Sequence, residues 1–321
     1  MSSSNTYDVC IIGGGPAGHS AALYTSRGML KTVLFEGIMN PGGQLTQTTE
    51  VENYLGFPEG IQGYELCMRF KEQSEKWGTE VLSENVEKIT ESEIEKCFNV
   101  YYDEMNKCII TKSVIICSGS TARLLEFEGS SQFWNKGITA CAVCHGALPM
   151  FRNKPLFVVG GGDTAMEDAL YLSKYTQEVY IVHRRDSFRA SKIMQQRVFS
   201  NPNIKILWDT EIVKASGTDL LESIRLRNNK SGEEKEYNAS GLFYAIGHTP
   251  CSDFLRGSDL YIALDSEGYI ITEEDSTKTT VDGIFCAGDI REKDKKFKQA
   301  IVAAGTGCKA ALEAIDYLQQ Q

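Results

Sequence analysis

The sequence predicts an α/β protein with two Rossmann-like dinucleotide-binding domains. Two observations carry this prediction: a glycine-rich loop follows a short apolar run at Gly13, and a second such loop follows another apolar run at Gly160. The length of 321 residues suits two domains. Hydrophobic residues make up 42% and charged residues 24% of the chain, which argues against a disordered or collagen-like protein.

The first unit begins with the apolar run 7–12, which we expect to be a strand. A glycine-rich loop follows, then a helix to about Arg27, and then a second apolar run, 32–35, that ends in an acid. In such a unit the glycines permit a tight turn, close approach of backbone to a pyrophosphate, and packing of helix on strand, while the acid binds ribose. The phosphates face the helix N-terminus. The alternative is an ordinary glycine-rich turn. The candidate dinucleotide-binding residues are Gly13, Gly14, Gly15, Pro16, Ala17, Gly18 and Glu36.

The second unit repeats the pattern. The apolar run 155–159 leads into a loop whose last small residue is Ala165, an accepted variant of the third glycine. A helix is expected to about Tyr175, and a strand over 178–182. This second strand ends in a basic cluster instead of an acid. Arginines bind a 2′-phosphate that a carboxylate would repel, so the second site is predicted to prefer NADP(H); a solvated surface cluster is the alternative. The candidates here are Gly160, Gly162, Asp163, Thr164, His183, Arg184, Arg185 and Arg189.

Later in the chain no third loop of this kind follows Pro250. The segment 283–289 is predicted to be a strand that ends in a turn carrying an acid. The last helix is expected over roughly residues 299–318.

Two of the ten cysteines, Cys141 and Cys144, stand three residues apart. This spacing allows a disulfide, and a position at the start of a helical turn would favour the thiolate, so a redox dithiol is predicted. Three alternatives stay open. A structural zinc would need two further ligands, and no second pair exists; Cys-x-x-Cys-His is also a haem-attachment pattern; and the pair could be inert and buried. The other eight cysteines are scattered, and most are expected to be small buried hydrophobes.

Charge and targeting signals exclude several classes. The net charge is −10, which disfavours a nucleic-acid binder. No run approaches the ~18 apolar residues of a membrane helix, and no signal-peptide pattern precedes Tyr7. A cytoplasmic location without membrane or nucleic-acid partners is therefore expected, and no metal site is predicted.

The motifs together resemble the low-molecular-weight thioredoxin reductases over nearly the whole chain. They are the segments 13–18, 42–45, 52–58, 141–144, 151–154, 160–163, 183–186, 243–248 and 287–289.

That resemblance implies FAD at the first loop and NADPH at the second, with the NADPH domain (120–248) inserted into the FAD domain (1–119 and 249–321). It adds flavin-site residues outside the first loop: Gln44, Asn53, Val86, Gly288, Asp289, Lys298, Gln299 and Ala300. Lysine at position 298 replaces the arginine of the family's run, so a bidentate contact becomes a point charge. The resemblance also implies a homodimer, and rotation of one domain against the other about two linkers near 118–123 and 247–250.

The resemblance further implies the activity of a thioredoxin-disulfide reductase. Hydride would pass from NADPH to FAD, then to the Cys141–Cys144 disulfide, and finally to thioredoxin by thiol–disulfide exchange. Cys144 would face the flavin and Cys141 would attack the partner.

One residue departs from the family pattern. The family usually has aspartate after the second cysteine, and here it is His145, whose imidazole could exchange the same proton. Related dithiol oxidases carry histidine at this position but lack a working NADPH site. Two other relatives differ from this chain: the hydroperoxide-reductase flavoprotein has an extra N-terminal region, and the ferredoxin–NADP reductases of this fold lack the cysteine pair. A redox-silent nucleotide sensor would keep both loops without turnover.

Overall fold

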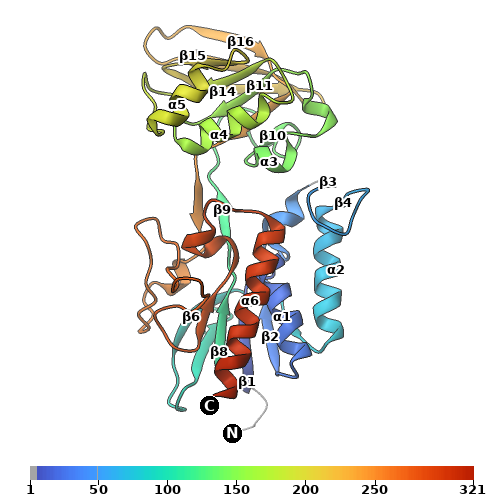
Figure 1. Ribbon diagram of the computed structural model, residues 1–321, viewed down its shortest axis with the longest axis vertical. Coiled ribbons are helices and arrows are strands. Elements are labelled where there is room, and N and C mark those ends of the chain that lie inside the picture. Colours follow the sequence, from blue (N-terminus) through green and yellow to red (C-terminus); the bar gives the residue numbers. More distant parts are fainter. Residues whose placement is uncertain (1–5, 49) are drawn as a thin grey trace. The chain divides into compact units, whose positions relative to one another are not determined.

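The computed structural model describes residues 6–48 and 50–321. They form two compact units (Figure 1). Unit 1 comprises the residues up to 121 together with 249–321, and unit 2 comprises 122–248. Unit 2 is thus inserted into unit 1. The boundary expected after residue 119 lies two positions before the observed one, and that expected after residue 248 coincides with it. The α/β class is confirmed, with a parallel sheet behind each glycine-rich loop.

A seven-stranded sheet forms the centre of unit 1, in the order β5-β2-β1-β8-β7-β6, with β19 also paired to β8. Strands β5, β2, β1, β8 and β19 are parallel, whereas β7 and β6 are antiparallel additions. The bounds are β1 (Thr6–Ile12), β2 (Thr32–Phe35), β5 (Glu80–Leu82), β6 (Val86–Glu91), β7 (Phe98–Tyr102), β8 (Lys107–Ile116) and β19 (Ile284–Cys286). The short strands β3 (Glu50–Val51) and β4 (Ile61–Gln62) pair separately.

The apolar run of β1 is buried on both faces of this sheet, as is typical of a central parallel strand. Val9 and Ile11 join one core cluster with alanines of α1 and α6, while Cys10 and Ile12 join the cluster on the opposite face. This alternation follows from the period of two along a strand. Packing on both faces therefore fixes β1, and with it the start of the loop that follows.

Three helices belong to unit 1: α1 (Pro16–Arg27), α2 (Gly63–Lys76) and α6 (Ala300–Gln319). Pro16 stands in the first turn of α1, where its missing N–H costs nothing. Helix α6 packs closely on α1 (Figure 1), because a Cβ at Gly307 would lie only 2.1 Å from the Ala17 carbonyl oxygen. Four short 3-10 helices complete the unit: η1 (Gly43–Gln47), η3 (Asp253–Leu255), η4 (Gly288–Ile290) and η5 (Glu292–Asp294).

Unit 2 has a five-stranded parallel sheet in the order β10-β17-β11-β12-β13 and a three-stranded antiparallel sheet, β14-β15-β16. The bounds are β10 (Ile138–Thr139), β11 (Leu156–Val159), β12 (Val179–Val182), β13 (Ile204–Leu207), β14 (Thr210–Gly217), β15 (Leu221–Asn228), β16 (Glu234–Asn238) and β17 (Gly241–Tyr244). Helices α3 (Ala142–His145), α4 (Asp163–Leu172) and α5 (Lys192–Phe199) and the 3-10 helix η2 (Pro149–Phe151) complete it. Residues of α4 share one core cluster with Leu156 and Val158, while Phe157 packs with residues of β14 and β15 on the other face.

Helix α4 is shorter than the sequence predicts. It ends at Leu172 instead of about Tyr175. The Ser173 hydroxyl donates to the Leu170 carbonyl at 2.8 Å, and such local bonds compete with helix continuation. The Tyr175 carbonyl then accepts from the Asn153 N–H at 2.9 Å, outside any helix. The last helix, in contrast, differs from its expected bounds by only one residue at each end.

The chain passes between the units twice, and the two passing segments pair with each other as β9 (Ser120–Ala122) and β18 (His248–Pro250). The Arg123 N–H donates to the Gly247 carbonyl at 3.0 Å, and the Cys251 N–H donates to Gly119 at 3.0 Å. The start and end of unit 2 are therefore hydrogen-bonded neighbours.

Candidate functional site

Cys141 and Cys144 form a disulfide in unit 2, with a Cα–Cα distance of 5.3 Å. Strand β10 leads to Cys141, which stands at the N-terminus of the short helix α3. The Cys144 N–H donates to the Cys141 sulfur at 3.1 Å. A thiolate at Cys141, formed when the pair is reduced, would be stabilised by this N–H, because hydrogen bonds to a charged acceptor are about twice as strong as neutral ones. The structure thus pairs the two cysteines, as their spacing predicts.

His145 is the last residue of α3, and its side chain is buried, with the residue only 8% exposed. Its ring atom Nδ1 lies 2.8 Å from the Thr139 hydroxyl. Burial lowers the pKa of His145 below its ordinary value, and a hydrogen bond with the Cys141 backbone offsets this in part. The imidazole is therefore neutral at pH 7 and has a lone pair with which to accept a proton.

Helix α3 is held against α4 by contacts that require a glycine. A Cβ at Gly146 would lie 2.7 Å from the Ala142 carbonyl oxygen and 2.7 Å from a methyl of Leu172. The Tyr171 hydroxyl donates to the Val143 carbonyl at 3.5 Å. Val143, between the two cysteines, keeps 48% of its surface exposed. The disulfide therefore lies on a surface turn with a rigid base.

The glycine-rich loop of unit 1 has the geometry of a phosphate cradle. Gly13 has φ +116° and lies so close to the Cys117 carbonyl that a Cβ would be 2.2 Å from its oxygen. A Cβ at Gly18 would lie 1.8 Å from the Gly13 oxygen, so helix α1 rests directly on the loop. At Gly15 the nearest atom, the Gly42 oxygen, is 3.9 Å away. The first and third glycines are therefore required by packing, while the second leaves room for a ligand.

Glu36 follows β2 and is buried, with its side chain 2% exposed. Lys71 of α2 forms an ion pair with its Oε1 at 2.9 Å, and the Ser83 hydroxyl donates to the same oxygen at 2.6 Å. Gly14 packs against Glu36, since a Cβ there would lie 2.5 Å from the Glu36 Cβ and 2.8 Å from its Cα. The carboxylate is thereby fixed beside the loop, where a ribose is expected.

Ser120 brings together several predicted flavin-site residues. The Gln44 amide donates to the Ser120 carbonyl, and the Lys298 ammonium donates to its hydroxyl at 2.8 Å. The Asn53 amide donates to Gln299 Oε1 at 3.1 Å. Residues that are far apart in the sequence thus form two contacting groups, one around Ser120 and the other between Asn53 and Gln299. Sequence reasoning missed Ser120, which lies within the expected linker.

Asp289 follows β19 in η4 and is largely buried, and this burial raises its pKa to about 6. The Lys298 ammonium donates to the Asp289 backbone carbonyl at 3.2 Å and lies 4.7 Å from the centre of the Tyr269 ring. Burial lowers the pKa of Lys298. Tyr269, which contacts Lys298 through its ring, belongs to no motif and was not among the predicted site residues.

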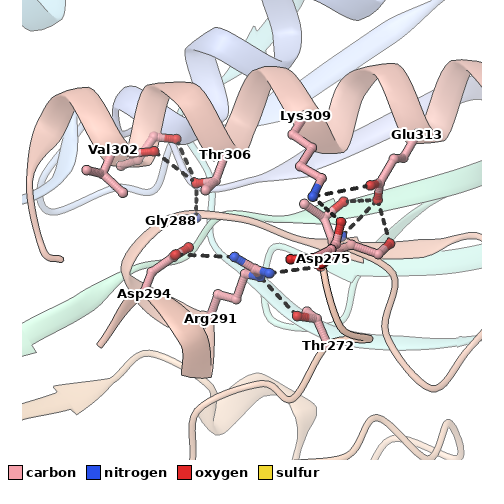
Figure 2. A network of polar contacts seen from close by, with 12 residues as sticks. Thr272, Asp275, Gly288, Arg291, Asp294, Val302, Thr306, Lys309 and Glu313 are labelled. Carbon is pink, nitrogen blue, oxygen red and sulfur yellow. Dashed lines mark hydrogen bonds and ion pairs between the residues drawn. The ribbon is translucent and has the colours of Figure 1, made fainter. Parts of the chain in front are cut away.

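Figure 2 shows the polar network that holds this turn against α6. The Thr306 hydroxyl accepts from the Gly288 N–H at 3.0 Å. Arg291, 7% exposed, donates to Asp294 at 3.2 Å and to Thr272 at 2.9 Å. The second oxygen of Asp294 is buried without a hydrogen-bond partner in the described part of the chain. The buried Arg291 is therefore the main group that offsets the cost of burying the Asp294 carboxylate.

Two other predicted flavin-site residues occupy simpler positions. Val86 begins β6 and packs against the core of unit 1. Its neighbour Asn85 accepts from the Ile38 N–H at 3.2 Å, which places this strand start near the end of β2. Ala300 is the first residue of α6, directly after Gln299.

The loop of unit 2 repeats the cradle. A Cβ at Gly160 would lie 2.5 Å from the Ala245 oxygen, and one at Gly161 would lie 2.2 Å from the His183 ring. A Cβ at Gly162 would meet nothing within 4 Å. Packing therefore requires glycine at positions 160 and 161, whereas the space around Gly162, directly before α4, is open.

The three arginines of the basic cluster, Arg184, Arg185 and Arg189, are exposed. Their segment is tied to the cradle, because the Arg189 N–H donates to the Gly161 carbonyl at 2.8 Å. Asp163, in the first turn of α4 with the exposed Thr164, accepts from the Ser191 N–H at 2.7 Å. These contacts tie the segment that carries the predicted arginines to the glycine-rich loop and to the start of α4.

His183 occupies a different position from the arginines. Its residue is 8% exposed, and its Nε2 lies 2.9 Å from the Ser187 carbonyl. The ring packs against Gly161 and near Phe188 and Trp208. The structure therefore shows His183 supporting the loop from behind.

In the described part of the chain the eight remaining cysteines form no disulfide, and five of them are buried: Cys10, Cys67, Cys97, Cys117 and Cys286. Within residues 6–48 and 50–321, no three or more His, Cys, Asp or Glu side chains gather so that they could hold a metal ion. Among the helices described, none combines the length and the apolar composition needed to cross a bilayer.

Comparison with known proteins finds relatives along nearly the whole chain. Residues 7–307 match the family described as pyridine nucleotide-disulphide oxidoreductase. The chain is 51% identical to thioredoxin reductase 1, mitochondrial, of Arabidopsis thaliana, over 97% of this chain and 84% of the relative. It is 47% identical to thioredoxin reductase of Dictyostelium discoideum, over 99% of each. The solved structure of thioredoxin reductase from Giardia duodenalis superimposes with a TM-score of 0.91 at 39% identity, over 98% of this chain and 100% of that one.

Proposed function

We propose that this chain, which belongs to the pyridine nucleotide-disulphide oxidoreductase family, is an NADPH-dependent thioredoxin-disulfide reductase with FAD. The observation that carries the proposal is the Cys141–Cys144 disulfide on a surface turn of a chain that has two separate dinucleotide cradles. FAD, when bound, accepts hydride from NADPH and delivers two electrons to a disulfide.

The first cradle fits FAD. Gly15 leaves the space that a pyrophosphate needs, and Glu36 is fixed by Lys71 and Ser83 at the expected ribose position. The flavin end would be lined by Gln44, Asn53, Asp289, Lys298 and Gln299, and the adenine end by Val86. Gly288 and Ala300 would contact FAD between these two ends. The buried Asp289 and the desolvated Lys298 are costly in a protein without a ligand, which supports their role in holding one.

The second cradle fits NADPH. Gly162 leaves the phosphate position open, and the exposed Arg184, Arg185 and Arg189 lie on a segment hydrogen-bonded to Gly161. Their guanidinium groups would bind the 2′-phosphate that distinguishes NADPH from NADH. His183 contributes by supporting Gly161.

The reduced cysteine pair transfers its electrons to thioredoxin. Cys141 is the attacking sulfur, because it receives the Cys144 N–H and lies at the start of α3. Cys144 is assigned to the flavin side and then resolves the mixed disulfide. His145 adjoins the pair as a neutral, buried imidazole and exchanges the proton that thiol and thiolate need.

A homodimer and a cytosolic location complete the proposal. Unit 1 exposes large apolar side chains such as Tyr64, Met68 and Trp77, which supports burial in an interface. Light scattering with size-exclusion chromatography tests the dimer, and fractionation of cells that express the native gene tests the location.

The decisive experiment follows NADPH consumption by the purified yellow protein with thioredoxin and a disulfide acceptor. Cys141→Ser and Cys144→Ser should each abolish thioredoxin reduction while NADPH still bleaches the flavin. Cys108→Ser, at a half-buried cysteine of β8 in unit 1, is the matched control and should keep normal turnover. A colourless protein that FAD does not reconstitute, or turnover with oxygen alone and not with thioredoxin, would contradict the proposal.

A further inference from the structure

Thr139 of β10 connects the redox pair with His145 through a single hydroxyl. Its Oγ1 lies 2.8 Å from His145 Nδ1, and it accepts from the Cys141 N–H at 3.4 Å. Thr139 is 6% exposed and His145 is 8% exposed, so water has little access to this contact. The buried Thr139 hydroxyl thus contacts both His145 and Cys141.

This contact determines which ring nitrogen can serve the sulfurs. The Thr139 hydroxyl contacts Nδ1. In the tautomer in which Nδ1–H donates to the Thr139 oxygen, Nε2 of the neutral ring holds the lone pair and can take a proton from a cysteine. The ring is also restrained in rotation, because Thr139 is anchored in β10 by pairing with Phe243 of β17.

We propose that Thr139 is a positioning residue for the dithiol step, acting through His145. It holds the imidazole so that Nε2, on the side of the ring opposite the hydroxyl, exchanges protons with the cysteine pair. This inference rests on the proposed thioredoxin reductase activity and on the proton role of His145.

The thiol–disulfide exchange proceeds through two successive attacks. Nε2 takes the proton of the Cys141 thiol, and the Cys141 sulfur then attacks one sulfur of the partner's disulfide. The other partner sulfur leaves with the electron pair and takes the proton from His145. The Cys144 sulfur next attacks Cys141, restores the intramolecular disulfide and releases the second partner sulfur, which receives the proton of Cys144. Two electrons and two protons pass to the partner, which is reduced while the pair is oxidised.

The test compares Thr139→Val, which removes the hydroxyl at nearly constant shape, with Thr139→Ser, which keeps it. In the holoenzyme, Thr139→Val should lower kcat with thioredoxin about tenfold, the rate equivalent of one net hydrogen bond. The KM for thioredoxin and the rate of flavin bleaching by NADPH should stay near wild type, and Thr139→Ser should recover most of the rate. Thr176→Val is the matched control, because this buried threonine of unit 2 donates to Lys154, away from the pair; it should keep wild-type kcat.

A double variant separates positioning from a purely structural role. His145→Ala should slow turnover about 10²-fold. If Thr139 acts through His145, adding Thr139→Val to His145→Ala should slow it no further. Full additivity of the two losses, or an unchanged kcat in Thr139→Val, would overturn the inference. Absence of thioredoxin reduction by the wild-type protein would instead refute the proposed function.

Discussion

Replacing Gly162 by alanine should weaken NADPH binding without weakening the fold. Gly162 precedes α4 with φ −99° and ψ −180°, a conformation open to any residue. A Cβ at this position meets no atom within 4 Å. Substitution of glycine by alanine at a compatible position stabilises a protein by about 0.4–1 kcal/mol, because the unfolded chain loses entropy. The melting temperature should therefore stay the same or rise.

The effect on binding follows from the same open space. A methyl group there occupies the position through which a pyrophosphate approaches the backbone. Loss of one hydrogen bond to a charged phosphate costs about 1.5–3 kcal/mol. At about 1.4 kcal/mol for each factor of ten, the dissociation constant of NADPH should rise roughly tenfold to a hundredfold.

Two measurements on the holoenzyme check this prediction: an NADPH titration followed by fluorescence, and thermal unfolding. Gly161→Ala is the contrasting variant, since its Cβ would lie 2.2 Å from the His183 ring; it should lower the melting temperature. Wild-type NADPH affinity in Gly162→Ala would refute the assignment of the cradle. A loss of stability in that variant would refute the packing argument.

Three further predictions concern charge. Arg184→Ala combined with Arg185→Ala should raise the KM for NADPH more than tenfold and leave that for NADH nearly unchanged; equal losses with both cofactors, measured by steady-state kinetics, would rule out a 2′-phosphate site. Burial lowers the pKa of His19 to about 4, below the unfolded value of about 6.5, so the unfolded chain binds a proton first. The free energy of unfolding should therefore fall by up to about 3 kcal/mol as the pH drops from about 6.5 to 4. In urea unfolding, His19→Asn should lose less of its free energy of unfolding over this pH range than the wild type. Arg291→Met leaves Asp294 as a buried charge without its cation and should cost about 3–5 kcal/mol; adding Asp294→Leu should recover most of the lost melting temperature, and no recovery would contradict the pairing.

The sequence predicts those parts of the molecule that depend on local rules. Each glycine-rich loop follows a strand that an apolar run predicts. Its position can be predicted because each glycine meets a requirement of the strand–loop–helix unit itself. The cysteine pair is likewise recognisable, since three residues of spacing at a helix start bring the sulfurs together. These features need no knowledge of distant residues.

The remaining site residues depend on contacts between distant segments. Ser120 receives Gln44 and Lys298, and Tyr269 packs under Lys298; neither residue belongs to a pattern that a single sequence reveals. Thr139 has a chemical role only because β10 turns into α3 beside it. For these residues the type alone is uninformative, and only tertiary packing selects them.

His183 shows the opposite difficulty. A histidine at the head of a basic cluster is a natural candidate for phosphate binding, yet its ring lies buried behind Gly161. Strand β12 ends at Val182, and directly after it His183 is buried whereas Arg184 and Arg185 are exposed. The three arginines face solvent, and the histidine fills the space beneath the loop.

The pairing of β9 with β18 has a consequence for biosynthesis. Residues 122–248 leave the ribosome as a complete unit whose two ends are already neighbours. The first half of unit 1, in contrast, must wait for β19 and α6, which supply one strand of its sheet and the helix that covers α1. Because domains fold as units during synthesis, the inserted unit is expected to mature first. The residues of unit 1 that are translated before unit 2 are thus among the last to reach their final structure.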